Sequence, residues 1–180
     1  IDVIGIQSHM HQGYWGVEKT LRVLELFEHF KLPIHFTENT IVSGRIMPPE
    51  ITDLNDYQVN DWHTTPEGEE RQAREVVSHY KTLFSHPLVE AITWWDLSDG
   101  AWLNAPSGLL RRDHSPKPAY DELLKLVKGE WWLSPTTMTT DANGQLILTG
   151  FLGDYALTAG GQKATFAVDN KDSAEVTITL

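Results

Sequence analysis

The stretch that decides the fold is residues 3–38, which read VIGIQSHMHQGYWGVEKTLRVLELFEHFKLPIHFTE. Its apolar start over residues 3–9 is typical of a buried strand. Residues 16–31 then repeat apolar side chains three and four positions apart, which predicts a helix with one wide apolar face. Residues 34–38 predict a second strand. Strand, helix and strand in this order indicate a right-handed crossover between two parallel strands.

The same alternation continues downstream. Residues 66–84 predict a helix, because Thr65 can cap it, Pro66 suits its first position and glutamates follow in its first turn. A third strand is expected over 88–95 and a third helix over 118–127. Three such units are too few to close a barrel or to cover both faces of an open sheet. The pattern therefore predicts one part of a larger parallel α/β fold.

The chain changes character after the third helix. Residues 134–180 show no helical period, and short Thr-rich alternating stretches are separated by Gly, Asn and Asp turn signals. We expect an antiparallel, β-sandwich-like module of four or five strands, with strands near 146–148, 155–158, 164–168 and 175–179. The predicted domains are residues 1–132 and residues 133–180.

Composition excludes several classes of partner. Among 180 residues, 14 are Lys or Arg and 25 are Asp or Glu, which leaves a net charge of -11. This charge repels phosphate backbones and anionic lipids, so we expect neither nucleic acid nor membrane as a partner. The absence of Cys excludes disulfides, zinc–thiolate sites and thiol nucleophiles. Seven Trp residues indicate either a large core or stacking platforms for sugar rings.

Polar side chains stand where the predicted parallel strands end. Gln7 and His9 end the first strand, Glu38 ends the second and Trp95 ends the third. Period-two alternation places Gln7 and His9 on one face, and it places Glu38 on the face of Phe36. Strand ends of a parallel sheet meet at one edge, where functional groups gather. A carboxylate, an amide, an imidazole and an indole at one edge suit the cleavage of a glycosidic bond.

Each of these residues also has a plainer interpretation. Glu38 can be a structural strand-end carboxylate, His9 a hydrogen-bonded core histidine, and the tryptophans core packing. His9 and His11 stand two apart like a metal pair, but no third ligand follows at a suitable spacing, so we expect no metal. Ser8 and Ser98 lack a Gly-x-Ser-x-Gly elbow, which argues against a serine hydrolase.

Four segments, in order, resemble glycoside hydrolase family 10, the endo-β-1,4-xylanases. The resemblance covers about residues 1–130. Residues 1–9 (IDVIGIQSH) resemble the family's sixth strand, and residues 37–39 (TEN) resemble the end of its seventh strand. Residues 95–102 (WDLSDGAW) resemble the exit of the eighth strand, and residues 109–120 (LLRRDHSPKPAY) resemble the run that enters the last helix.

The resemblance implies the last three βα units of a (β/α)8 TIM barrel and a retaining mechanism without a cofactor. It implies that Glu38 is the nucleophile and that His9 hydrogen-bonds this nucleophile. Gln7 would support the acid/base residue and belong to the substrate-binding residues. Trp95 and Trp102 would wall the sugar subsites nearest the cleaved bond.

The chain departs from the family pattern in several places. The family's acid/base glutamate follows the fourth strand, in a half of the barrel that this sequence lacks. Asn39 and Thr40 stand where the family usually has an aliphatic residue and an aspartate. The long loop between 39 and 65 carries Tyr57 and Trp62, which we expect on the active face as substrate contacts.

We therefore expect a fragment of a secreted xylanase-like enzyme that carries the nucleophile but not the acid/base. Its substrate would be β-1,4-xylan or a related β-linked plant polysaccharide. The chain opens inside a strand without Met or a leader, so we expect a fragment or a processed product. Because it would supply only one of the two carboxyl groups that retaining chemistry needs, we expect the 180 residues alone to be inactive. The missing N-terminal half, or another chain, would cover the open sheet edges. The alternative is a non-catalytic carbohydrate-binding protein on the same kind of barrel.

Overall fold

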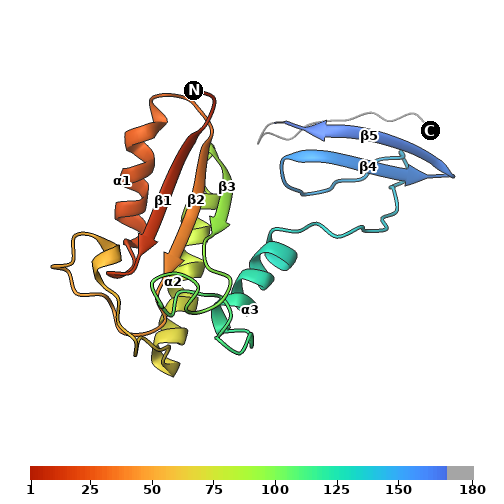
Figure 1. The fold of residues 1–180 in the computed structure, drawn as a ribbon. Coiled ribbons are helices and arrows are strands. Elements are labelled where there is room, and N and C mark those ends of the chain that lie inside the picture. Colours follow the sequence, from red (N-terminus) through yellow and green to blue (C-terminus); the bar gives the residue numbers. More distant parts are fainter. Residues whose placement is uncertain (170–180) are drawn as a thin grey trace. The chain divides into compact units, whose positions relative to one another are not determined.

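The computed structural model describes residues 1–169 of the chain (Figure 1). The chain divides into two compact units, Ile1–Leu126 and Val127–Leu180. The first unit contains the strands and helices that precede the predicted change of character. The predicted boundary between residues 132 and 133 stays a prediction.

The first unit alternates strands and helices along a parallel sheet. The strands lie in the order β1-β2-β3, and both neighbouring pairs are parallel. Among the described residues, β1 and β3 pair only with β2, so the sheet is open at both edges. The elements are β1 (Ile4–Met10), α1 (Gly16–Glu28), β2 (Ile34–Ile41), the 3-10 turn η1 (Leu54–Asp56), α2 (Pro66–Phe84), β3 (Val89–Trp94) and α3 (Pro118–Lys125). The π-helical turn η2 (Leu126–Glu130) begins at the last residue of this unit and continues into the second.

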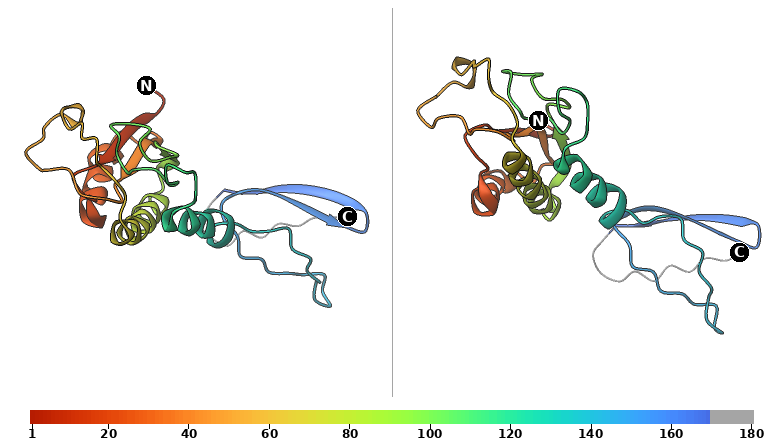
Figure 2. Two further views of the ribbon diagram at one scale, coloured as in Figure 1. Left: turned by 60° about the horizontal axis from the view of Figure 1, so that its bottom comes forward. Right: turned by 90° about the horizontal axis from the view of Figure 1, so that it is seen from below.

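The helices of this unit lie on one side of the sheet (Figure 2). The core between sheet and helices joins side chains from both strands and helices, and its buried members are Ile6, Leu24, Ile34, Phe36 and Leu83. Burial of these apolar side chains stabilises the layer by removing their surface from water. The opposite face of the sheet carries exposed residues at Gly5, Gln7 and Thr93.

Helix α2 begins and ends where the sequence predicts. Thr65 has extended backbone angles, and its side-chain oxygen accepts a hydrogen bond from the Gly68 N–H at 3.0 Å. This bond satisfies one of the free N–H groups of the first turn. Pro66 occupies the first helical position, where it removes no helical hydrogen bond.

A β-bulge in β2 corrects the predicted orientation of Glu38. The pairing with β1 runs from Ile6↔Phe36 to Gln7↔Glu38, so Thr37 is an extra residue in β2. A bulge shifts the alternation of side chains by one position. Phe36 is therefore buried in the core on the helix side, whereas Glu38 lies on the opposite face with Gln7. The prediction that Glu38 shares the face of Phe36 was wrong.

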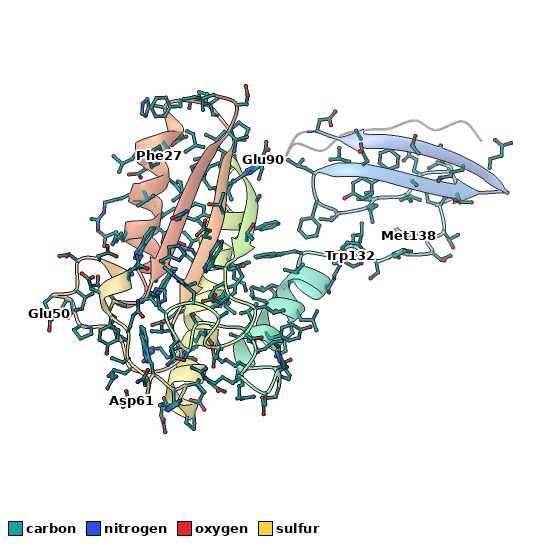
Figure 3. All side chains as sticks on the ribbon, viewed as in Figure 1. Phe27, Glu50, Asp61, Glu90, Trp132 and Met138 are labelled. Carbon is teal, nitrogen blue, oxygen red and sulfur yellow. The ribbon has the colours of Figure 1, made fainter. Side chains whose placement is uncertain are left out.

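The long connection from β2 to α2 lies at the end of the sheet where the strands finish (Figure 3, labels Glu50 and Asp61). It forms a small core together with the loop after β3. The buried members of this core are Val42, Met47, Trp62 and, from the loop after β3, Ala105. No helix within residues 1–169 is long and apolar enough to cross a membrane.

The second unit contains an antiparallel hairpin of β4 (Gly153–Ala159) and β5 (Gln162–Val168). Gly160 and Gly161 close it with φ of 57° and 81°, angles that suit the two-residue turns of hairpins. Tyr155 stacks on Phe166 with ring centroids 5.4 Å apart.

This hairpin confirms the strands predicted near 155–158 and 164–168. Residues 146–148 belong to no strand, so that prediction was wrong; within the described part of the tail, only β4 and β5 pair with each other. The strand predicted over 175–179 lies outside the described residues.

Candidate active site

Glu38 is held at both of its carboxylate oxygens. The side-chain amide of Gln7 donates to Oε1 at 2.8 Å, and His9 Nε2 lies 3.0 Å from Oε2. An ionised carboxylate only accepts hydrogen bonds, so Nε2 carries the hydrogen in this pair. The side chains of His9 and Glu38 are 13% and 20% exposed, which leaves the carboxylate open to a ligand. The structure thus brings together the three residues predicted at the ends of the first two strands.

The second ring nitrogen of His9 also has a partner. Nδ1 lies 3.3 Å from the Thr40 hydroxyl oxygen. Thr40 follows Glu38 by two residues in β2 and is paired with His9 in the strand register. Thr40 is fully buried, and its contact with the partly exposed His9 is part-buried.

Two tryptophans stand beside His9. The Trp102 ring centroid lies 4.6 Å from that of His9, and the Trp95 ring meets His9 edge-on at 6.1 Å. Trp95 follows β3 directly, and its backbone N–H donates to the Asn39 carbonyl at 3.0 Å. The residue is 48% exposed. Partly exposed aromatic rings near a carboxylate offer flat apolar surfaces on which a sugar ring can lie.

The structure corrects the expectation for Trp62. This side chain is 1% exposed, and its indole N–H donates to the Arg45 carbonyl at 2.7 Å. It therefore stabilises the core of the long loop and presents no face to a substrate. Tyr57 meets the Trp62 ring edge-on at 4.9 Å, and that contact places it in the same loop core.

The long loop instead contributes side-chain amides to a pocket that Trp102 also lines. An open pocket lies between this loop and the loop after β3. Its lining contains no charged side chain, and consists of Asn55, Gln58, Val59, Asn60, Trp102, Leu103 and Asn104. Amide groups can donate to and accept from hydroxyl groups. The sequence predicted Trp102 here but none of the amides.

Comparison with known protein families identifies the family of this chain. Residues 1–126 match the family described as Glycosyl hydrolase family 10. The chain belongs to glycosyl hydrolase family 10. Its three parallel strands and their helices form part of the family's (β/α)8 barrel, and the described sheet is not closed into one. The fold class predicted from the sequence is thereby confirmed.

Solved structures of family 10 enzymes share this fold. A GH10 endoxylanase from a sugarcane soil metagenome is 23% identical with a TM-score of 0.54, over 70% of this chain and 42% of that one. Xylanase B from Clostridium stercorarium F9 is 22% identical with a TM-score of 0.55, over 68% and 37%. Xylanase 10B from Thermotoga petrophila RKU-1, solved with xylobiose, is 23% identical with a TM-score of 0.51, over 72% and 37%.

This family 10 chain therefore spans less than half the length of these xylanases. No curated protein matches it. At this level of identity, the solved structures establish a shared fold. The roles of Glu38, His9, Gln7, Trp95 and Trp102 stay predictions.

Two buried groups lie near His9: His11, which the sequence analysis weighed only as half of a metal pair, and Asp96, which it did not single out. His11 is fully buried against Trp62 and Trp102, and burial together with the nearby His9 lowers its pKa to about 4. Asp96 is 3% exposed, and the Ser107 hydroxyl donates to it at 2.5 Å. Burial raises the pKa of Asp96. Asp96 directly follows Trp95, so its position next to a predicted site residue was the available signal.

A buried lysine ties together the loops around the site. Lys117 is fully buried, and Nζ donates to Asp99 Oδ1 at 2.5 Å, to Ser43 Oγ at 2.8 Å and to the Gly108 carbonyl at 2.9 Å. These partners join the loop after β2 to the loop after β3. Burial lowers the pKa of Lys117 and raises that of Asp99, so the three hydrogen bonds are what make the buried ammonium tolerable.

The arrangement favours carboxylate chemistry. Across residues 1–169, no group of three or more His, Asp or Glu side chains is placed to hold a metal ion. One partly exposed carboxylate with two hydrogen-bond donors, beside two indoles, can attack or stabilise an electrophilic carbon of a sugar ring.

Proposed function

We propose that this chain is the nucleophile-bearing part of a retaining glycoside hydrolase that cleaves β-1,4-xylan or a related plant polysaccharide. The observation that carries the proposal is Glu38, held through both oxygens by Gln7 and His9 at the strand ends of a family 10 barrel segment. Support comes from solved family 10 structures that are xylanases, one of them in complex with xylobiose.

In the proposed reaction, a Glu38 oxygen forms a bond to the anomeric carbon as the bond to the leaving oxygen breaks. A second carboxyl group donates a proton to that oxygen, then removes one from the water that hydrolyses the glycosyl-enzyme. Retaining enzymes place the two carboxyl groups roughly 5 Å apart. We propose that the second group comes from a part of the barrel outside this chain.

The neighbours of Glu38 have distinct parts in this proposal. Gln7 and His9 fix the orientation of the carboxylate, which lowers the entropic cost of reaching the attacking geometry. Trp95 and Trp102 present their rings to the sugar. Because xylan is a polymer too large to enter a cell, we propose that the enzyme acts outside the cell, joined to the remaining half of its barrel or to another chain.

The test is covalent labelling with an activated 2-fluoro-xylobioside, followed by intact mass and peptide mapping. Its good leaving group needs no acid catalyst, so the missing carboxyl group does not block the first step. We expect one label, on Glu38. Glu38→Gln should abolish the label. Glu90→Gln, at the exposed start of β3 (Figure 3), is the matched control and should keep it.

The chain should be labelled both alone and together with the upstream part of its barrel. A label on another residue would contradict the proposal. No label on the isolated chain, with a label on the longer polypeptide, would show that the chain alone does not complete the subsite. No label on either would point to the second candidate.

That second candidate is a non-catalytic carbohydrate-binding protein on the same barrel. The burial of Asp96 favours this candidate. It leaves Glu38 as the one partly exposed carboxylate at the strand ends that the structure describes, and retaining chemistry needs two. A full-length sequence without a glutamate after the fourth strand would support it. Calorimetric binding of xylobiose without any label would distinguish it from the enzyme.

A further inference from the structure

The hydrogen bonds of His9 and Thr40 can be counted atom by atom. His9 contacts Glu38 through Nε2 at 3.0 Å and Thr40 through Nδ1 at 3.3 Å. Thr40 is fully buried, and among the described residues its hydroxyl has His9 Nδ1 as its one side-chain partner. Because Thr40 is buried, its hydroxyl can form hydrogen bonds only with neighbouring protein groups.

This count allows one protonation state of the ring. A buried hydroxyl whose hydrogen finds no acceptor is costly, so the Thr40 O–H must donate to Nδ1. Nδ1 accepts a hydrogen bond only when it carries no hydrogen itself. Glu38, as a carboxylate, needs a hydrogen on Nε2. A neutral ring protonated at Nε2 satisfies both contacts, whereas a doubly protonated ring would donate to the Thr40 oxygen and leave the hydroxyl hydrogen without an acceptor among the described residues.

We infer that Thr40 is a positioning residue, whose hydroxyl donates to Nδ1 and holds His9 as a neutral Nε2–H donor to Glu38. The inference deepens the proposed function and rests on it for its catalytic meaning. A neutral donor orients Glu38 without cancelling its negative charge. The carboxylate therefore keeps the charge that attack on an anomeric carbon requires.

The other titratable groups that face His9 do not supply a competing contact. They are Glu38 on β2, His11 on β1 and Asp96 after β3. Asp96 accepts the Ser107 hydroxyl at 2.5 Å, and His11 approaches ring to ring, with centroids 6.2 Å apart. Trp95 and Trp102, which pack on the ring, are uncharged.

The direct test is nitrogen NMR of the full chain with ¹⁵N-labelled histidine at neutral pH. His9→Gln identifies the His9 signals. We expect one protonated nitrogen, Nε2, and one hydrogen-bonded acceptor nitrogen, Nδ1. Thr40→Ser should preserve both signals, because it keeps the hydroxyl. Thr40→Val should move the Nδ1 signal to that of a free acceptor nitrogen and slow covalent labelling about fivefold, the equivalent of one neutral hydrogen bond.

Two further variants sharpen the result. Thr40→Asp supplies an acceptor in place of a donor, so both His9 nitrogens should become protonated at neutral pH. Thr37→Val is the matched control, because Thr37 lies on the same strand with its hydroxyl on the Ile6 carbonyl, and it should leave the His9 signals unchanged.

A doubly protonated His9 in the unmodified chain would overturn the inference, and so would an Nδ1 signal that does not respond to Thr40→Val. The response of the Nδ1 signal to Thr40→Val can be measured even if the Thr40→Asp variant fails to fold. The nitrogen signals are independent of sugar chemistry. Expected signals without a label on Glu38, either in the chain alone or in the longer polypeptide, would therefore refute the proposed function and leave the assignment of the ring intact.

Discussion

Neighbouring residues of β1 and β2 build two polar clusters on opposite faces of the same sheet. The site cluster consists of Gln7, His9 and Glu38 on the open face. The core cluster consists of Ser8, Asn39 and His79 on the face covered by helices. Each contains one histidine, yet the first is partly exposed and holds a carboxylate, and the second is fully buried and holds an amide.

The core cluster pairs its polar groups with one another and with backbone carbonyls, except for His79 Nδ1, which has no partner among the described residues. Asn39 Oδ1 accepts from the Ser8 hydroxyl at 2.5 Å and from His79 Nε2 at 2.9 Å. Asn39 Nδ2 donates to the Thr93 carbonyl at 2.8 Å. Burial lowers the pKa of His79 to about 4, so the cluster is neutral at pH 7.

The difference between the clusters follows from the cost of burying charge. An ionised carboxylate without water is expensive, and it stands on the face where water and ligands have access. An amide can be buried once its donors and acceptors are paired. This also accounts for Asn39, an unusual residue for its position, because Ser8 and His79 supply its partners.

The largest expected effect concerns function on the open face. Glu38→Gln should abolish covalent labelling, because the amide cannot act as the nucleophile. The free energy of unfolding should change by no more than about 1 kcal/mol, since the side chain is partly exposed. Mass spectrometry and urea unfolding of the same samples measure the two effects. A loss of folding in this variant would contradict the separation between the clusters.

The next effect concerns stability on the covered face. Asn39→Leu strands the Ser8 hydroxyl, the His79 N–H and the Thr93 carbonyl in the core, and should cost about 2–4 kcal/mol. Asn60→Leu, at an exposed loop position, is the matched control and should change stability by about 0.5 kcal/mol or less. Urea unfolding at pH 7 compares them, and equal costs would mean that the core cluster contributes no net stability.

Acid should destabilise the chain through the buried His79 of the covered face. The pKa of His79 is about 4 when folded and about 6.5 when unfolded, so the unfolded chain binds more protons between these values. Stability is therefore complete above pH 6.5 and is lost as the pH falls toward 4. This single group should cost about 2 kcal/mol between pH 7 and pH 5.

Unfolding at both pH values measures this loss. His79→Gln, which can still donate to Asn39, should reduce the pH-dependent loss by that amount. His11, whose pKa is also lowered to about 4, should preserve a similar loss in both proteins. His29→Gln, on the exposed end of α1, is the matched control for the substitution. An unaltered pH dependence in the His79 variant would show that His79 is protonated without penalty.

The smallest effect separates two adjacent tryptophans. Trp94 packs toward the helices, near Tyr80, and donates to the Ser107 carbonyl at 3.1 Å, so Trp94→Leu should cost about 2 kcal/mol. Trp95 is half exposed, so Trp95→Leu should cost less than about 1 kcal/mol while weakening xylobiose binding. Unfolding and calorimetry on both variants give the comparison. The reverse order of costs would mean that the faces of β3 are assigned incorrectly.

Much of this fold was predictable from local sequence. The bounds of α2, the parallel order of strands and helices, and the hairpin around 155–168 all follow from periodicity, capping and turn residues. That Gln7, His9 and Glu38 stand at one edge of the sheet was also predictable, because parallel strands end at the same edge. Trp62 and Lys117 were not predictable, since their environment is made by residues far away in the chain: Met47 and Ala105 around Trp62, and Ser43 and Asp99 around Lys117.

The sequence by itself determined which elements form and which side chains stand at the strand ends, because hydrophobic periodicity and turn chemistry act over a few neighbouring residues. Only the tertiary structure decided which way Glu38 points. The pairing of β2 with β1 accommodates Thr37 as a bulge, and this one extra residue turns the carboxylate from the core to the open face. Side-chain alternation predicts a face only where the register is unbroken, and register is a property of two strands together.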